Sequence, residues 1–136
     1  MSTLTRSLPF AALALRAGIS LTLATSGLIH AELYAHGYRY VPVIGPGFLA
    51  QASVFVALAI LIAVGGPRWL QGLALAGALG SLAAFAASRT VGLFGFTEHG
   101  WQPAPQAIVS VIAEVFTVAL CATALSGARS GAAGRI

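Results

Sequence analysis

Four long apolar segments restrict the folds open to this chain more than any other feature of its sequence. They cover residues 9–34, 47–64, 69–88 and 105–127. The shortest has 18 residues, and a helix of that length reaches roughly 27 Å, close to the thickness of a bilayer core. The sequence therefore predicts four transmembrane helices, in a single all-α integral membrane domain of 136 residues.

The connections between these segments predict how the helices are arranged. The second and third segments are separated by Gly65, Gly66, Pro67 and Arg68 alone. Helices joined by so short a turn must lie side by side and run in opposite directions. We expect an antiparallel four-helix transmembrane bundle.

The composition excludes several classes of protein. Charged residues make up 7% of the chain, whereas a typical soluble domain has about 25%, so the lipid bilayer is the expected environment. The net charge of +4 comes from seven scattered arginines that form no basic stripe for phosphates, so we expect no nucleic-acid partner. The single cysteine, Cys121, is expected to be a small buried apolar residue.

The arginines also predict an orientation. Five of them fall on the side of both termini (Arg6, Arg16, Arg68, Arg129 and Arg135), and only Arg39 and Arg89 fall on the other side. By the positive-inside rule both termini are then cytoplasmic, in a multi-pass protein of the plasma membrane.

Two of the apolar segments carry a polar face. In the first, residues at steps of four share one face, and they are Gly18, Thr22, Ser26, His30 and Tyr34. In the fourth, one face holds Gln106, Ser110, Glu114, Thr117 and Cys121. A carboxyl as deep as that of Glu114 is unfavourable in lipid, so it should face protein or water. We expect the two faces to meet and to form a polar interior that descends from the outer surface to Glu114.

The remaining unusual side chains gather at the predicted outer surface. Histidines, acids and aromatic residues lie there, and with the two polar faces they give these candidates for a ligand-binding pocket: His30, Glu32, Tyr34, His36, Gln51, Arg89, Glu98, His99, Trp101 and Glu114. Glu32 and His36 stand four residues apart and can pair on a helix.

Several cofactors have ligands of this kind. His30, His36 and His99 supply imidazole nitrogens of the type that bind zinc, copper or iron, and a haem between His30 and His99 is a second option. A quinone near His30 and Tyr34 is a third. Because no spacing matches a metal signature and no catalytic motif is present, we expect no bound cofactor and no enzymatic activity, with haem, a metal ion or a quinone as the alternatives.

The third apolar segment repeats small residues every four positions: Gly72, Ala76, Gly80, Ala84 and Ser88. Such spacing lets another helix approach closely in lipid. We expect this face to pack within the bundle, with a homodimer through Gly72, Ala76, Gly80 and Ala84 as the alternative.

The first segment resembles the first helix of DoxX-like proteins, which are small four-helix bacterial membrane proteins. The resemblance rests on Arg16, Gly18, Gly27 and His30 and on the chain's length and helix number. The second segment departs from the family pattern because it has no acidic residue. The resemblance implies a bacterial membrane and an accessory subunit of a membrane redox complex, linked to quinone.

These observations lead to three hypotheses about function. The first is a non-catalytic accessory or ligand-binding membrane protein with an outward-facing pocket of histidine, glutamate and aromatic residues. The second is a subunit of a membrane oxidoreductase that carries haem, metal or quinone. The third is a proton-coupled carrier of small solutes that uses Glu114.

Overall fold

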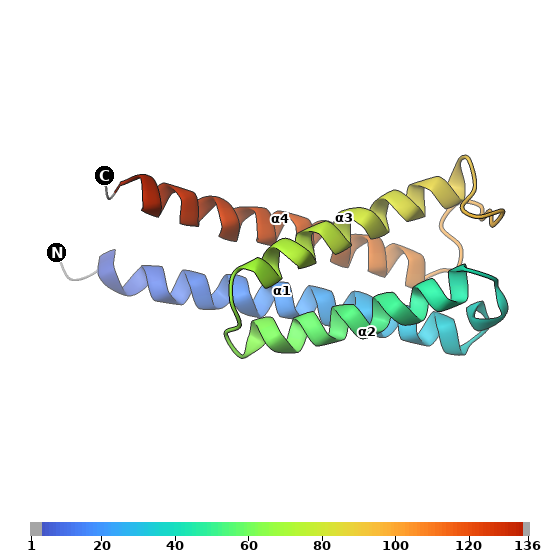
Figure 1. Ribbon diagram of the computed structural model, residues 1–136, viewed down its shortest axis with the longest axis horizontal. Helices are drawn as coiled ribbons and strands as arrows, with labels where there is room; N and C mark the ends of the chain where they lie inside the picture. The colour runs from blue at the N-terminus through green and yellow to red at the C-terminus, as the bar shows by residue number, and fades with distance from the viewer. Residues whose placement is uncertain (1–3, 135–136) are drawn as a thin grey trace.

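The computed structural model describes residues 4–134 and is built from four long helices (Figure 1). They are α1 (Leu4–Ala35), α2 (Ile44–Ala63), α3 (Trp69–Arg89) and α4 (Gln106–Ala133), and a short 3₁₀ helix, η1 (Tyr38–Tyr40), lies between the first two. Each long helix contains a stretch that is long and apolar enough to cross a membrane: Phe10–Ala35, Ile44–Ala63, Trp69–Arg89 and Gln106–Gly131. The predicted all-α membrane fold with four spans is confirmed at this level.

At three of their ends the helices are longer than the sequence pattern predicted by more than one residue. α1 begins at Leu4 instead of residue 9, α2 begins at Ile44 instead of residue 47, and α4 continues to Ala133 instead of ending at residue 127. The early start of α2 places Pro46 in its first turn, where a missing N–H breaks no helical hydrogen bond. The extension of α4 is rich in alanine, the best helix former.

Each helix packs against two others. α1 lies against α2 and α4, and α3 lies against the same two helices. In Figure 1 the start of α1, the end of α4 and the α2–α3 turn lie toward one end of the elongated bundle, which we call the terminal end. The connections 36–43 and 90–105 lie at the opposite end, which we call the loop end.

A dry apolar cluster fills the half of the bundle nearer the terminal end. Ile19 and Leu23 of α1 are fully buried there, and Cys121 of α4 is buried with them, as expected. The rest of the cluster comes from α2 and α3: Phe55, Leu58, Ala59, Ile62, Leu70 and Ala74. Large apolar side chains such as Leu21 and Ile60 are instead exposed, which suits surfaces that face lipid.

The small residues of α3 pack differently from the expectation. A Cβ added at Gly72 or Gly80 would meet nothing within 4 Å, so the expectation that this face packs inside the bundle is wrong at both positions. Gly77 is the glycine of α3 against which another helix packs closely, because a Cβ added there would lie 2.9 Å from the ring of Phe55 on α2. The close approach of α2 and α3 therefore uses a different face of α3.

Candidate functional site

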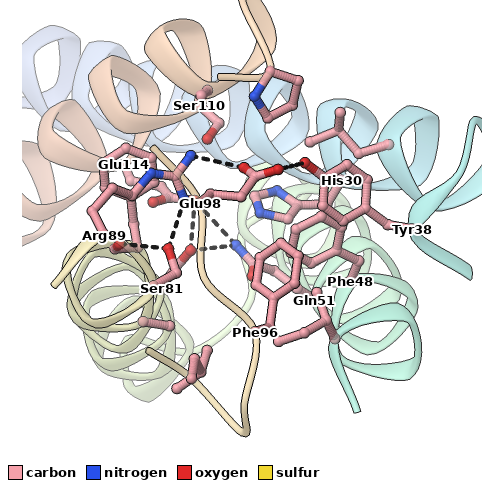
Figure 2. A pocket seen from close by; sticks show the side chains of 18 residues that line it. His30, Tyr38, Phe48, Gln51, Ser81, Arg89, Phe96, Glu98, Ser110 and Glu114 are labelled. Carbon is pink, nitrogen blue, oxygen red and sulfur yellow. Dashed lines mark hydrogen bonds and ion pairs between the residues drawn. The ribbon is translucent and has the colours of Figure 1, made fainter. Parts of the chain in front are cut away.

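Glu114 lies at the centre of a hydrogen-bond network that joins all four helices. Its contacts with Gln51 and Ser81 can be followed in Figure 2. Its side chain is 1% exposed. Its Oε1 atom accepts a hydrogen bond of 2.7 Å from Ser26 of α1, one of 3.0 Å from Gln51 of α2 and one of 2.8 Å from Ser81 of α3. The amide of Gln51 also donates to the hydroxyl of Ser81 at 2.7 Å. One carboxyl oxygen thus fixes one residue of every other helix at the same depth.

The polar faces predicted on the first and fourth segments do meet. Ser26 donates to Glu114, and one turn deeper the hydroxyl of Thr117 donates to that of Thr22 at 2.7 Å. Thr117 is buried. The polar interior therefore ends close to Glu114 and Thr117, and below them begins the apolar cluster of Ile19 and its neighbours.

A cavity of about 80 Å³ lies between Glu114 and the loop end. Its walls come from all four helices, from η1 and from the 90–105 connection, and they include the aromatic rings of Phe48 and Phe96. A water molecule needs only about 10–15 Å³ of such volume, whereas pockets for drug-sized ligands measure about 300–1,000 Å³. The cavity therefore suits a few waters or one small solute.

Glu114 and Ser110 both present polar atoms to this cavity. All three donors reach Oε1 of Glu114, and within residues 4–134 its Oε2 has no hydrogen-bond partner. Ser110 is 6% exposed and lines the cavity one turn closer to the loop end. In the described part of the chain its hydroxyl also makes no hydrogen bond to protein, so both atoms are available to whatever occupies the cavity.

His30 supplies a third polar group. Its Nδ1 lies 2.8 Å from the backbone carbonyl of Ser26, which can only accept, so Nδ1 carries the hydrogen. In the neutral ring Nε2 is then an acceptor. The ring is 6% exposed, lines the cavity and packs edge-on against Phe48 with centroids 4.9 Å apart. The bond to the backbone of α1 therefore fixes the orientation of the ring and leaves Nε2 as its hydrogen-bond acceptor.

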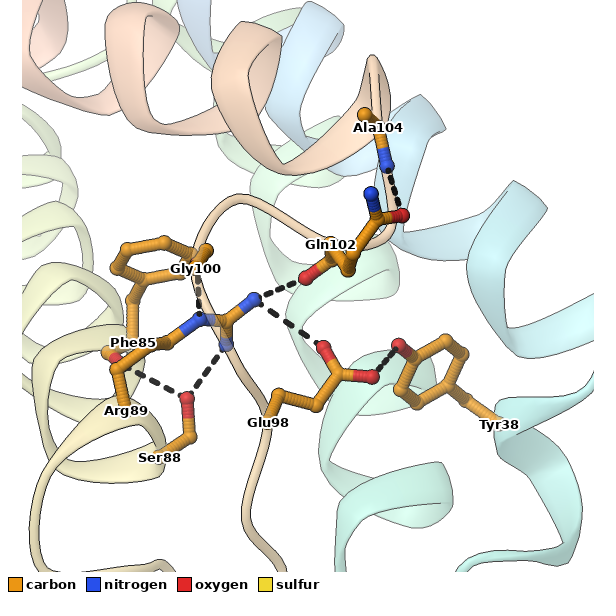
Figure 3. A network of polar contacts seen from close by, with 8 residues as sticks. All are labelled: Tyr38, Phe85, Ser88, Arg89, Glu98, Gly100, Gln102 and Ala104. Atoms are coloured by element: carbon orange, nitrogen blue, oxygen red, sulfur yellow. Dashed lines mark hydrogen bonds and ion pairs between the residues drawn. The ribbon is translucent and has the colours of Figure 1, made fainter.

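A second polar network lies at the loop end of the cavity (Figure 3). Glu98 forms an ion pair of 3.1 Å with Arg89 and accepts a hydrogen bond of 2.5 Å from the hydroxyl of Tyr38. Arg89 also donates to the backbone carbonyls of Gly100 and Gln102. The network, which we call the loop-end network, ties α3, η1 and the 90–105 connection together over the cavity.

Tyr38 is placed by a close backbone contact. A Cβ at Gly45 would lie 2.5 Å from the carbonyl oxygen of Tyr38, so only glycine lets η1 lie this close to the first turn of α2. Burial, the hydrogen bond to Glu98 and the charge of Glu98 raise the pKa of the Tyr38 phenol, against a smaller lowering by Arg89. The Tyr38 phenol therefore keeps its proton, and stays a hydrogen-bond donor, to a higher pH than an ordinary tyrosine does.

The structure brings five of the ten predicted pocket residues together. Those that line the cavity are His30, Gln51, Arg89, Glu98 and Glu114. The other five do not line it: Glu32, Tyr34, His36, His99 and Trp101.

The residues outside the cavity have other contacts or face outward. Glu32, His36 and His99 are exposed. The ring of His36 contacts Glu32 through the backbone, since its Nδ1 lies 2.9 Å from the carbonyl oxygen of Glu32. Trp101 stacks on Phe85 with ring centroids 5.6 Å apart. Across residues 4–134 no three His, Cys, Asp or Glu side chains are grouped so that they could hold a metal ion. The structure thus does not gather the predicted set of His30, His36 and His99.

Three aromatic residues are among the cavity residues that sequence reasoning did not single out: Tyr38, Phe48 and Phe96. Phe48 and Phe96 are apolar residues in apolar surroundings, and no sequence signal separates such rings from ordinary packing. Tyr38 was not among the candidates, and its bond to Glu98 spans 60 positions. Only the folding of the 90–105 connection over the helices reveals that bond.

Comparison of the chain with protein-family models, with curated proteins and with solved structures found no match.

Proposed function

We propose that this chain is a multi-pass membrane protein that binds one small cation with N–H donors, such as ammonium or a primary amine, in the cavity above Glu114. The observation that carries the proposal is the set of acceptors at the cavity: Oε2 of Glu114, the hydroxyl of Ser110 and the free nitrogen of His30. Each belongs to a side chain that is at least nine-tenths buried. Three acceptors match the three N–H groups of a primary ammonium.

Charge favours the same class of ligand. An ionised carboxyl inside a membrane bundle is unfavourable without a compensating charge, and the three groups bonded to Glu114 are all neutral donors. Arg89 also lines the cavity, but its charge is paired with Glu98. A bound cation would supply the missing positive charge, and the rings of Phe48 and Phe96 would favour it through their π faces.

We further propose that the bundle is antiparallel and that the terminal end lies in the cytoplasm, so that the cavity is near the outer surface. The position of the start of α1 and the end of α4 toward one end of the bundle supports this arrangement (Figure 1). Arg16 and Arg68 toward that end support the orientation through the positive-inside rule. A bacterial plasma membrane and a homodimer through Gly72 and Gly80 remain predictions.

The other hypotheses about function have less support. A haem or quinone needs a pocket several times larger than 80 Å³, and His36 and His99 are exposed away from the cavity. A proton-coupled carrier would use Glu114 as its binding group. Since such a carrier must first bind its solute here, binding is the step to test.

The test is thermal unfolding of the purified protein in detergent, with methylammonium chloride compared with sodium chloride at equal ionic strength. We expect a saturable rise in Tm with methylammonium, because a ligand at about 100 times its Kd adds about 2.7 kcal/mol to the unfolding free energy. Tetramethylammonium has no N–H group and should give no rise.

Two variants make the test specific. Glu114→Gln keeps an acceptor for the three donors and should fold, but it should lose the response to methylammonium. Glu32→Gln changes an exposed glutamate outside the cavity and should keep the full response. Equal effects of both salts on the wild-type chain, or a response that survives in Glu114→Gln, would contradict the proposal.

A further inference from the structure

A second hollow lies toward the terminal end, far from Glu114. It is a groove of about 380 Å³ formed by α1, α4 and the first residues of α3. Arg16 and Arg68 line it with Gln71. The room comes from small side chains on the two facing helices, which are Ala11, Ala12, Gly127 and Ala128. This volume lies within the usual range of about 300–1,000 Å³ for ligand pockets.

The two arginines have no acidic side chain near them. The chain has three acidic residues. Glu114 bonds to Ser26, Gln51 and Ser81, Glu98 pairs with Arg89, and Glu32 belongs to the last turn of α1 at the loop end. Arg16 nevertheless lies inside the apolar stretch Phe10–Ala35, where an unpaired charged side chain is unfavourable. An anion in the groove would offset that cost.

The two arginines come from different elements, and different contacts fix their side chains. A Cβ at Gly65, in the α2–α3 turn, would lie 3.3 Å from Nη1 of Arg16, so the guanidinium of α1 reaches that turn. Arg68 precedes α3 and donates from Nη2 to the backbone carbonyl of Ala124 at 2.6 Å. That bond anchors Arg68 to α4, and a guanidinium has five N–H donors. Donors from both arginines therefore remain for a ligand.

Gln71 lines the same groove, and its side-chain amide is not fully used within the protein. Its Oε1 is buried and has no hydrogen-bond partner in the described part of the chain. The amide also carries an NH₂ group with two donors. A ligand with several acceptor oxygens would therefore accept hydrogen bonds from Gln71 as well as from both arginines.

We propose that this groove binds a phosphate group, namely that of an anionic phospholipid headgroup. Phosphate oxygens match the planar fork of a guanidinium, and basic hollows between transmembrane helices on the cytoplasmic side suit anionic headgroups. Lipid is the favoured source because the exposed apolar side chains of Phe10 and Leu13 lie on α1 next to the groove. Acyl chains of a bound lipid can pack against them.

The experiment measures lipid binding to the delipidated full chain in detergent by native mass spectrometry. Phosphatidylglycerol is compared with phosphatidylcholine, and inorganic phosphate is added in a separate arm. We expect phosphatidylglycerol to bind at least about ten-fold more tightly than phosphatidylcholine, because its headgroup carries a net negative charge that attracts both arginines, whereas the choline cation of phosphatidylcholine cancels that charge. Free phosphate should not displace it.

A matched pair of variants locates the site without removing a charge. Gly127→Leu places a side chain in the groove, whereas Gly131→Leu adds the same side chain one turn away on α4, outside the groove. Leucine favours a helix more than glycine does, so both variants should fold. Gly127→Leu should lower phosphatidylglycerol affinity at least about ten-fold, and Gly131→Leu should leave it unchanged.

Three results would overturn the proposal. Equal binding of the two lipids would show that the negative charge of the headgroup plays no part in binding. Unchanged phosphatidylglycerol binding in Gly127→Leu would show that the lipid binds elsewhere. Displacement by inorganic phosphate at similar concentrations would show that the groove takes free phosphate rather than a lipid headgroup.

Discussion

The two ends of the bundle handle charged side chains in opposite ways. At the loop end both cavity carboxyls have hydrogen-bond partners within the protein, because Glu98 pairs with Arg89 and Glu114 accepts three hydrogen bonds from neutral groups. At the terminal end Arg16 and Arg68 line an open groove with no acidic side chain beside them. The loop end is thus built around an internal polar network, whereas the charges of the terminal end are left for groups outside the chain.

The region between the two ends keeps them separate. The last polar contact below Glu114 joins Thr117 to Thr22, and next to it lie the fully buried Ile19 and Leu23. An apolar layer of this kind disfavours water between the cavity and the groove. The comparison therefore predicts that a change at one end leaves the other end unaltered.

The largest effect on stability is expected at Glu114. In Glu114→Leu, Gln51 loses its acceptor on α4, and so do Ser26 and Ser81. A serine can turn back to a carbonyl of its own helix, and hydrogen bonds between membrane helices average about 0.6 kcal/mol. We expect a loss of about 2 kcal/mol in unfolding free energy, measured by circular dichroism during titration with a denaturing detergent.

Two controls accompany this measurement. Glu114→Gln keeps an acceptor and should lose less than about 1 kcal/mol, and Glu32→Leu removes an exposed carboxyl with little effect. Lipid binding to the terminal groove should be the same in all three variants. Wild-type stability in Glu114→Leu would show that the network does not hold the helices together.

An intermediate effect is expected at Arg89, which binds the 90–105 connection. Arg89→Leu removes the ion pair to Glu98 and the bonds to the carbonyls of Gly100 and Gln102. The pair is partly exposed, so we assign its bonds a total of about 1.4 kcal/mol. Amide hydrogen exchange across 90–105 should then be about ten-fold faster.

The matched control for this change is Arg39→Leu. Arg39 lies at the same end of the bundle, but its guanidinium faces the ring of Tyr40 rather than the connection. Exchange across 90–105 should be unaffected in that variant. If Arg89→Leu also leaves it unaffected, the loop-end network does not close the cavity.

The sequence predicted the spans and part of the loop-end site for identifiable reasons. Apolar runs reveal transmembrane helices, and steps of four placed Ser26 and Glu114 on helix faces that do meet. Periodicity does not say how a connection folds, so the bond from Tyr38 to Glu98 was not predicted. Grouping residues by the predicted side of the membrane was too coarse, since His36 and His99 lie at the same end of the bundle as the cavity but are exposed.

The smallest effect, and the one that best separates the two ends, is expected at alkaline pH. Burial and Glu98 raise the pKa of Tyr38 in the folded chain above its ordinary value of about 10. A group whose folded pKa is raised stabilises the fold below its unfolded pKa, and that contribution is lost as pH rises through the folded pKa. Unfolding free energy should therefore fall as pH rises above about 10.

Tyr38→Phe isolates this contribution. Below about pH 9 the variant should be less stable than the wild type by about 1 kcal/mol, the value of one hydrogen bond, and the difference should shrink as pH rises further. A constant difference would show that the Tyr38 phenol does not titrate with the fold. Over the same range lipid binding at the terminal groove should not change, because guanidinium groups keep their charge. The sensitivity to alkaline pH that Tyr38 causes would then belong to the loop end, where Glu98 and Arg89 are paired within the chain.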